Sequence, residues 1–108
     1  MKLLLVSGPP NTATVAAGLT LMKKGYCVYF AQPVRLDLSP YGPILNLIGE
    51  DTQWKGRWNV NDIEMIKRVD GVYMCKGWTN EPICNVHMQC AKNGNKQLFF
   101  EGVTEPRD

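Results

Sequence analysis

The chain has 108 residues, and its twelve basic and ten acidic side chains give a formal net charge of +2. This length suits one domain whose hydrophobic core needs no disulfide or metal for folding. The near-neutral charge, without a basic cluster, disfavours a surface that binds nucleic acid polymers through their phosphates. No apolar run approaches the roughly twenty residues that span a bilayer, and the N-terminal MKLLLV is too short for a signal peptide. We therefore expect a single cytoplasmic domain over residues 1–108 that has no membrane partner.

The first part of the chain predicts a strand, a helix and a second strand. KLLLVS (2–7) is a continuous apolar run, as in a central parallel strand. Asn11 or Thr12 can cap the helix that follows, and Gly25 can end it. The predicted core face of this helix consists of Val15, Ala16, Leu19 and Met22. The run YCVYFA (26–31) then completes a right-handed parallel crossover.

Residues 33–60 predict an irregular segment that covers the site, because proline and glycine interrupt it repeatedly. One short helix is expected over residues 44–48. Trp54 can pack in the core or stack on a nucleobase. Arg35 and Arg57 can hold a phosphate or lie solvated on the surface.

A second helix–strand pair follows this segment. Asn61 can cap a helix whose Glu64 reaches back to it, so that Asp62 falls in the first turn. The inward face of that helix carries Ile63, Ile66 and Val69. GVYMC (71–75) is a short apolar run, which is typical of a strand that is covered on both faces.

The last helix is expected to begin near Pro82, because proline is tolerated in a first turn, and to end at Gly94 in a left-handed conformation. KQLFF (96–100) predicts a fourth strand. The polar tail EGVTEPRD (101–108) is expected to be frayed.

The four cysteines, Cys27, Cys75, Cys84 and Cys90, fall within predicted strands and helices, which favours reduced, buried thiols. Cys84, His87 and Cys90 have the spacing C-x-x-H-x-x-C. On a helix, these positions fan over about 120° and the outer two cannot converge on one tetrahedral ion. We therefore expect no metal site here.

Four strands that alternate with helices predict an open parallel α/β sheet of order 2-1-3-4, a Rossmann- or flavodoxin-like three-layer sandwich. Ligands bind such sheets at the carboxyl ends of the strands, where the strand order reverses. This rule selects the loops Ser7–Pro10 and Lys76–Asn80, and predicts one cleft that holds Gly8, Gly77 and Asn80. The first loop has neither G-x-G-x-x-G nor a phosphate loop, which disfavours nicotinamide cofactors and P-loop chemistry. No cofactor is expected.

Several features follow one another along the chain: a strand that ends in Gly-Pro, the motif N-D-I-x-x-I-x-x-x-D-x-V-Y-M, the motif G-W-x-N, a helix, and G-x-K. This order resembles the nucleoside 2-deoxyribosyltransferase superfamily, especially its small bacterial and phage members. The resemblance covers nearly the whole chain. It implies an enzyme that cleaves or exchanges the N-glycosidic bond of a nucleoside or nucleotide, with a glutamate on the last helix as nucleophile. Members commonly complete their sites across a subunit interface, so the resemblance also implies a homo-oligomer.

The motif positions divide into matches and departures. The residues that match are Gly8, Pro9, Asp62, Asp70, Gly77, Trp78 and Asn80. Three positions depart from the pattern: Glu81 stands where the family has Ser or Asp, Ile83 where it has Gly, and His87 where it has the nucleophilic Glu. An imidazole makes a poor covalent glycosyl carrier, so turnover is in doubt.

The resemblance implies a catalytic set of Asp62, His87 and Glu81 and a substrate-binding set of Ser7, Gly8, Pro9, Gly77, Trp78 and Asn80. Structural roles are the alternative for several of them. Asp62 can serve the helix dipole, His87 can lie at the edge of the core, and Trp78 can pack as an ordinary aromatic. Two functions follow from the sequence. The first is a nucleoside- or nucleotide-acting transferase or hydrolase. The second is a non-catalytic sensor, sequestering or interaction protein for nucleotide-derived metabolites.

Overall fold

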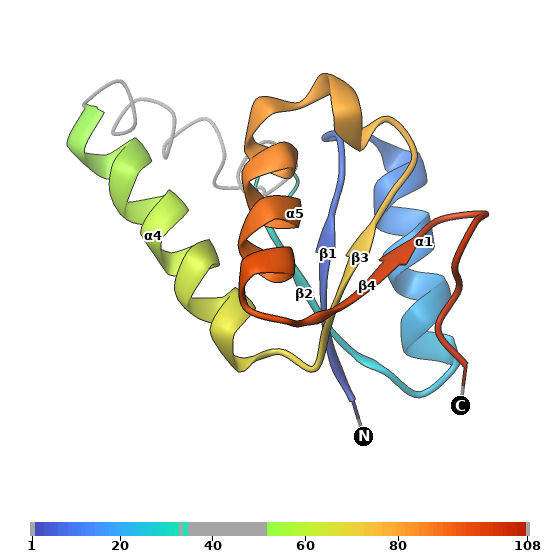
Figure 1. Ribbon diagram of the computed structural model, residues 1–108. Coiled ribbons are helices and arrows are strands. Elements are labelled where there is room, and N and C mark those ends of the chain that lie inside the picture. The colour runs from blue at the N-terminus through green and yellow to red at the C-terminus, as the bar shows by residue number, and fades with distance from the viewer. Residues whose placement is uncertain (1, 33, 35–51, 108) are drawn as a thin grey trace.

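The computed structural model describes residues 2–32, 34 and 52–107, and describes side chains in these ranges except at 52–59. Four strands form one parallel sheet of order β2-β1-β3-β4, which confirms the predicted α/β fold (Figure 1). The strands are β1 (Leu3–Ser7), β2 (Cys27–Phe30), β3 (Gly71–Met74) and β4 (Gln97–Phe100). The predicted helix at 44–48 and Arg35 lie outside the described residues, as do the side chains of Trp54 and Arg57.

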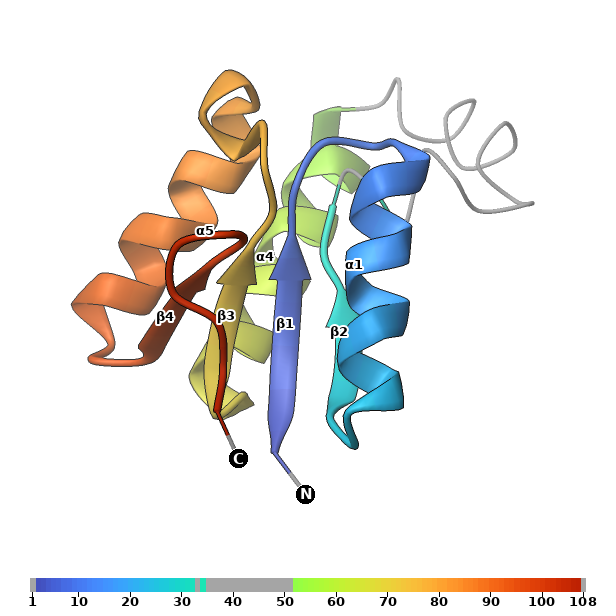
Figure 2. The same cartoon turned by 90° about the vertical axis from the view of Figure 1, so that its right-hand side faces the viewer.

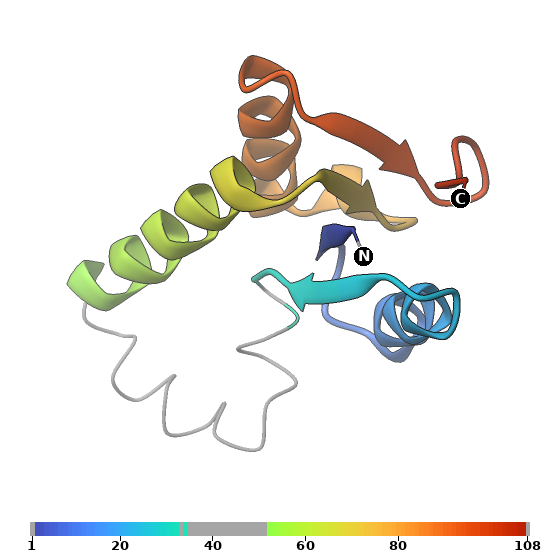
Figure 3. The same ribbon diagram turned by 90° about the horizontal axis from the view of Figure 1, so that it is seen from below.

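Helices cover both faces of the sheet. Helix α1 (Thr12–Lys23) lies on one face, and helices α4 (Thr52–Arg68) and α5 (Pro82–Asn93) lie on the other (Figure 2, Figure 3). A short 3-10 helix, η1 (Trp78–Asn80), leads from β3 into α5. No helix within the described ranges is long and apolar enough to cross a membrane.

Successive residues of the central strand β1 supply the two halves of the core. Leu5 packs in the cluster beneath α4 and α5, whereas Leu4 and Val6 pack in the cluster beneath α1. All three are completely buried. This burial on both sides confirms the prediction that the continuous apolar run KLLLVS (2–7) forms a central strand, which is covered on both faces.

Helix α4 begins at Thr52, nine residues before the predicted start at Asn61. The expected irregular segment 33–60 is therefore wrong over 52–60, and the Asn61 cap and the first-turn position of Asp62 are wrong with it. Gly56, one of the glycines that made this segment look irregular, lies inside the helix. One glycine inside a helix costs only about 1 kcal/mol and does not end it.

The core face of α1 is also displaced from the prediction. Leu19 and Met22 are 48% and 42% exposed, and the buried positions are Thr14, Gly18 and Leu21. A Cβ atom on Gly18 would lie 2.3 Å from the Phe30 ring. The close approach of α1 to β2 therefore requires the smallest residue at this position, and apolar periodicity does not count glycine as a core residue.

The predicted helix ends are partly correct. The Asn11 side chain accepts a hydrogen bond from the Thr14 N–H at 2.9 Å, which confirms this cap. Gly25 has the left-handed conformation expected of it, with φ of +99°. Gly94 ends α5 but has φ of −86°, and the left-handed residue is Asn95, with φ of 54°.

The C-terminal tail folds back and is not frayed. Thr104 forms an antiparallel bridge with Phe100. The Tyr73 hydroxyl donates to both Glu105 carboxylate oxygens at 2.8 Å, and the Gly102 N–H donates to the same side chain. Burial and the neighbouring Glu105 raise the pKa of Tyr73. The tail therefore covers part of the β3–β4 surface on the α1 side of the sheet (Figure 2).

Replacing Tyr73 by Phe should release this tail, because the substitution removes only the hydroxyl that Glu105 binds. We expect the free energy of unfolding at pH 7 to fall by about 1.5 kcal/mol. The pKa of Tyr73 is raised in the folded state, so this contribution is complete below the unfolded-state pKa of about 10 and is lost as the pH rises further. Urea titrations of both proteins between pH 7 and pH 11 measure the difference. An unchanged stability at pH 7 would contradict the role of the tail.

Candidate functional site

Three predicted site residues converge at the carboxyl end of β1. The Ser7 hydroxyl lies 2.8 Å from His87 Nδ1, and His87 Nε2 lies 3.6 Å from Asp62 Oδ2. Ser7 is the last residue of β1, Asp62 lies inside α4, and His87 lies inside α5. All three are 0% exposed. Together they form a sealed polar chain within an otherwise apolar region, which we call the Ser7–His87–Asp62 chain.

The Asp62 carboxylate also binds the strand next to β1. Asp62 Oδ1 accepts a hydrogen bond from the Tyr29 hydroxyl at 3.1 Å, and Oδ2 accepts one from the Gln32 backbone N–H at 3.0 Å. A buried carboxylate is tolerated when such donors replace its lost hydration. Asp62 therefore joins α4 to the carboxyl end of β2 as well as to α5.

The order of donors along the chain follows from electrostatics. A neutral imidazole has one N–H and one bare nitrogen, and the nitrogen that faces a carboxylate carries the hydrogen at lower energy. The neutral ring that fits these contacts carries its hydrogen on Nε2, which faces Asp62 Oδ2 at 3.6 Å, beyond hydrogen-bond length, and leaves Nδ1 to accept the Ser7 hydroxyl proton. Burial raises the pKa of the Cys84 thiol, and the neighbouring Ser7 hydroxyl opposes this rise.

Two buried side-chain donors have no hydrogen-bond partner among the described residues: His87 Nε2, which faces Asp62, and Gln32 Nε2. An unpaired buried donor costs about 1–3 kcal/mol, so each one requires an explanation. Sequence analysis overlooked Gln32, although it lies just beyond β2 at the carboxyl edge of the sheet. The rule that selected the loops after β1 and β3 does not select this position, because β2 is an edge strand and lies away from the point where the strand order reverses.

The glycines of the two predicted loops serve close packing. A Cβ atom on Gly8 would lie 2.7 Å from the Cys75 Cβ. Gly77 has φ of +89°, and a Cβ atom there would lie 3.1 Å from Pro9 Cγ. The two loops therefore touch each other, as their places at the sheet edge require.

The remaining predicted site residues lie around the start of α5. Glu81 precedes the helix at its N-cap position and is half-buried, without a side-chain capping bond. Asn80 is exposed in η1. Trp78 is half-buried and packs against Phe100, with ring centroids 5.9 Å apart. None of these three residues is part of the Ser7–His87–Asp62 chain.

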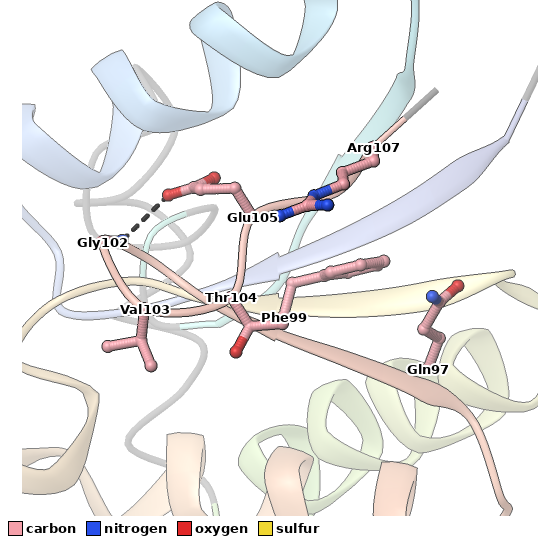
Figure 4. A pocket seen from close by; sticks show the side chains of 7 residues that line it. All are labelled: Gln97, Phe99, Gly102, Val103, Thr104, Glu105 and Arg107. Carbon is pink, nitrogen blue, oxygen red and sulfur yellow. Dashed lines mark hydrogen bonds between the residues drawn. The ribbon is translucent and has the colours of Figure 1, made fainter.

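A depression of about 260 Å³ opens at the carboxyl ends of β3 and β4, and Gly77 and Trp78 line it. Gly8 and Asn80 are not among its lining residues, so this depression is not the shared cleft that we predicted. A larger groove of about 560 Å³ lies between β4 and the tail, where Phe99, Gln97, Thr104 and Arg107 line it (Figure 4). Sequence analysis did not identify this groove, because it depends on the folded tail.

All four cysteines are free. Cys75 and Cys84 are buried as predicted, and burial raises the pKa of Cys75 to about 12. Cys27 is exposed at the edge strand, so the prediction of burial is wrong there. Among residues with described side chains, no three His, Cys, Asp or Glu residues gather as a metal site would require.

Comparison of the chain with family models, with curated proteins and with solved structures found no match in any of the three. The resemblance to nucleoside deoxyribosyltransferases therefore depends on the sequence motifs alone.

Replacing Ser7 by Ala should leave His87 Nδ1 buried without a partner. We expect the free energy of unfolding to fall by about 1–3 kcal/mol. Thr20→Ala is the matched control, because its hydroxyl donates to the Ala16 carbonyl at an exposed site of α1. Urea unfolding of the three proteins measures both effects. An equal, small loss in both variants would contradict a stabilising role for the Ser7 hydroxyl.

Proposed function

We propose that this domain binds a nucleoside or nucleotide at the carboxyl edge of its sheet. The main support is that Ser7, Asp62 and His87, which the deoxyribosyltransferase resemblance assigned to one site, lie in contact although they are far apart in sequence. Loops at this edge are also where open parallel sheets bind their ligands. The proposal needs no cofactor.

Binding without turnover is the form of this function that the geometry favours. A nucleophile or general base needs a lone pair within reach of the substrate. Both ring nitrogens of His87 are directed at other side chains, and the residue is completely buried. We therefore infer a sensor or sequestering role, with N-glycosidic cleavage or deoxyribosyl transfer as the second candidate, which the matching Asp62 favours.

A thermal-shift screen with nucleosides, nucleoside monophosphates and ADP-ribose tests the proposal. A ligand that binds only the folded state raises the melting temperature as its concentration exceeds its Kd. We expect at least one nucleoside or nucleotide to stabilise the protein at submillimolar concentration. Incubation of that ligand with the protein, followed by chromatography of the free base, then separates binding from cleavage. No ligand tighter than millimolar would overturn the proposal in favour of an interaction module.

A second test concerns the residue at the family's nucleophile position. From the resemblance alone, His87→Glu would restore a catalytic carboxylate. In the structure, the new carboxylate would be buried close to Asp62, and like charges in a buried site repel strongly.

We therefore expect His87→Glu to lower the free energy of unfolding by about 3–5 kcal/mol without creating base release. His87→Gln keeps a polar side chain without adding a charge, so it should lose less stability. Denaturant titration and the base-release assay, applied to both variants, measure these outcomes. A stable His87→Glu protein that releases base would instead support the catalytic alternative.

A further inference from the structure

The depression at the carboxyl ends of β3 and β4 combines an apolar floor with two charged rim residues. Met74, Trp78 and Phe100 supply the apolar side chains, and Lys76 and Glu101 supply the charges. We call these five residues the Trp78 pocket. Its volume of about 260 Å³ suits a compact ligand and does not suit a large one.

The aromatic part of the pocket is suited to a planar ring. The Trp78 and Phe100 rings are tilted by 43° to each other with centroids 5.9 Å apart, which is a common aromatic pair geometry. Met74 beneath them is completely buried, while Trp78 is only half-buried. A nucleobase could stack on the exposed part of Trp78, because every base offers an aromatic face.

The two charged residues on the rim differ in how firmly they are held. Glu101 Oε1 accepts the Lys76 backbone N–H at 2.9 Å, so this carboxylate has a fixed position. The exposed Lys76 side chain forms no ion pair with any residue that the structure describes, and its end lies beside Gly102. An acceptor held in place beside an exposed donor suits hydroxyl groups, which both donate and accept. A phosphate would instead lie next to the Glu101 carboxylate.

We propose that the Trp78 pocket binds an unphosphorylated nucleoside, with the base against Trp78 and Phe100 and the sugar hydroxyls between Lys76 and Glu101. This inference rests on the proposed function and specifies its ligand. Strand β3 lies between this pocket and β1, which carries Ser7. The bound nucleoside therefore lies apart from the Ser7–His87–Asp62 chain, as expected for binding without cleavage.

Isothermal titration calorimetry with uridine, cytidine, adenosine, guanosine and their 5′-monophosphates tests this site. We expect at least one nucleoside to bind the native protein more tightly than its monophosphate. Trp78→Leu should weaken the binding of that nucleoside about tenfold, because base stacking on an aromatic ring is lost. Trp78→Phe should weaken this binding less, since an aromatic ring is kept.

Glu101→Gln keeps an oxygen that can accept the Lys76 N–H but removes the charge. This variant should raise the affinity for the monophosphate relative to the nucleoside. Val86→Thr, at an exposed position of α5 outside the pocket, should change neither affinity. Circular dichroism of each variant verifies that it is folded.

The outcomes separate this inference from the proposed function. If the native protein binds a nucleoside, but folded Trp78→Phe, Trp78→Leu and Glu101→Gln proteins bind it unchanged, the Trp78 pocket is wrong and the proposed function stands. A monophosphate that binds more tightly than its nucleoside overturns the choice of ligand. No binding by the native protein overturns both proposals.

Discussion

The buried carboxylate of Asp62 is the constraint on which the carboxyl edge of this sheet depends. A charged group without solvent must be compensated by donors, and removing one member of a buried pair typically costs about 3–5 kcal/mol. Here the donors come from Tyr29 in β2 and from the backbone of Gln32, two residues beyond that strand, while His87 approaches from α5. Ser7 extends the contacts to β1. One side chain in the middle of α4 thereby fixes two strands and two helices relative to one another.

The strands and their order could be predicted because each strand is a short apolar run, and parallel strands that are covered on both faces need no alternation. The start of α4 could not, since Gly56 looked like a helix breaker and a helix interior tolerates one glycine at modest cost. The face of α1 was misjudged because it packs through Gly18 against Phe30. The tail could not be predicted to fold back, because its conformation depends on a hydrogen bond with Tyr73, which is distant in the sequence.

For the candidate site, the sequence identifies several residues but not the contacts between them. Ser7, Asp62 and His87 could be named from motif positions and from the rule that ligands bind at strand ends. Their mutual contact could not be predicted, because it depends on how α4 and α5 turn their side chains toward β1. Tyr29 and Gln32 carry no motif at all, and only the folded structure brings them to Asp62.

Burial and exposure divide the site into two parts with different chemistry. The Ser7–His87–Asp62 chain is sealed, so its hydrogen bonds organise the sheet edge. The Trp78 pocket lies at the surface beyond β3, where aromatic and charged side chains remain accessible. Such a division suits a protein that recognises a small molecule without transforming it, because the groups with catalytic potential are committed to holding the fold.

The ring nitrogen that carries the hydrogen in His87, the single histidine of the sequence, reports the orientation of the Ser7–His87–Asp62 chain. Long-range ¹H–¹⁵N NMR correlation of the His87 ring above neutral pH distinguishes the two tautomers by their nitrogen shifts. We expect hydrogen on Nε2, facing Asp62, and a bare Nδ1 that accepts the Ser7 hydroxyl proton. In Ser7→Ala the Nδ1 shift should move while Nε2 keeps its hydrogen. Hydrogen on Nδ1 with a bare Nε2 in the native protein would contradict this orientation.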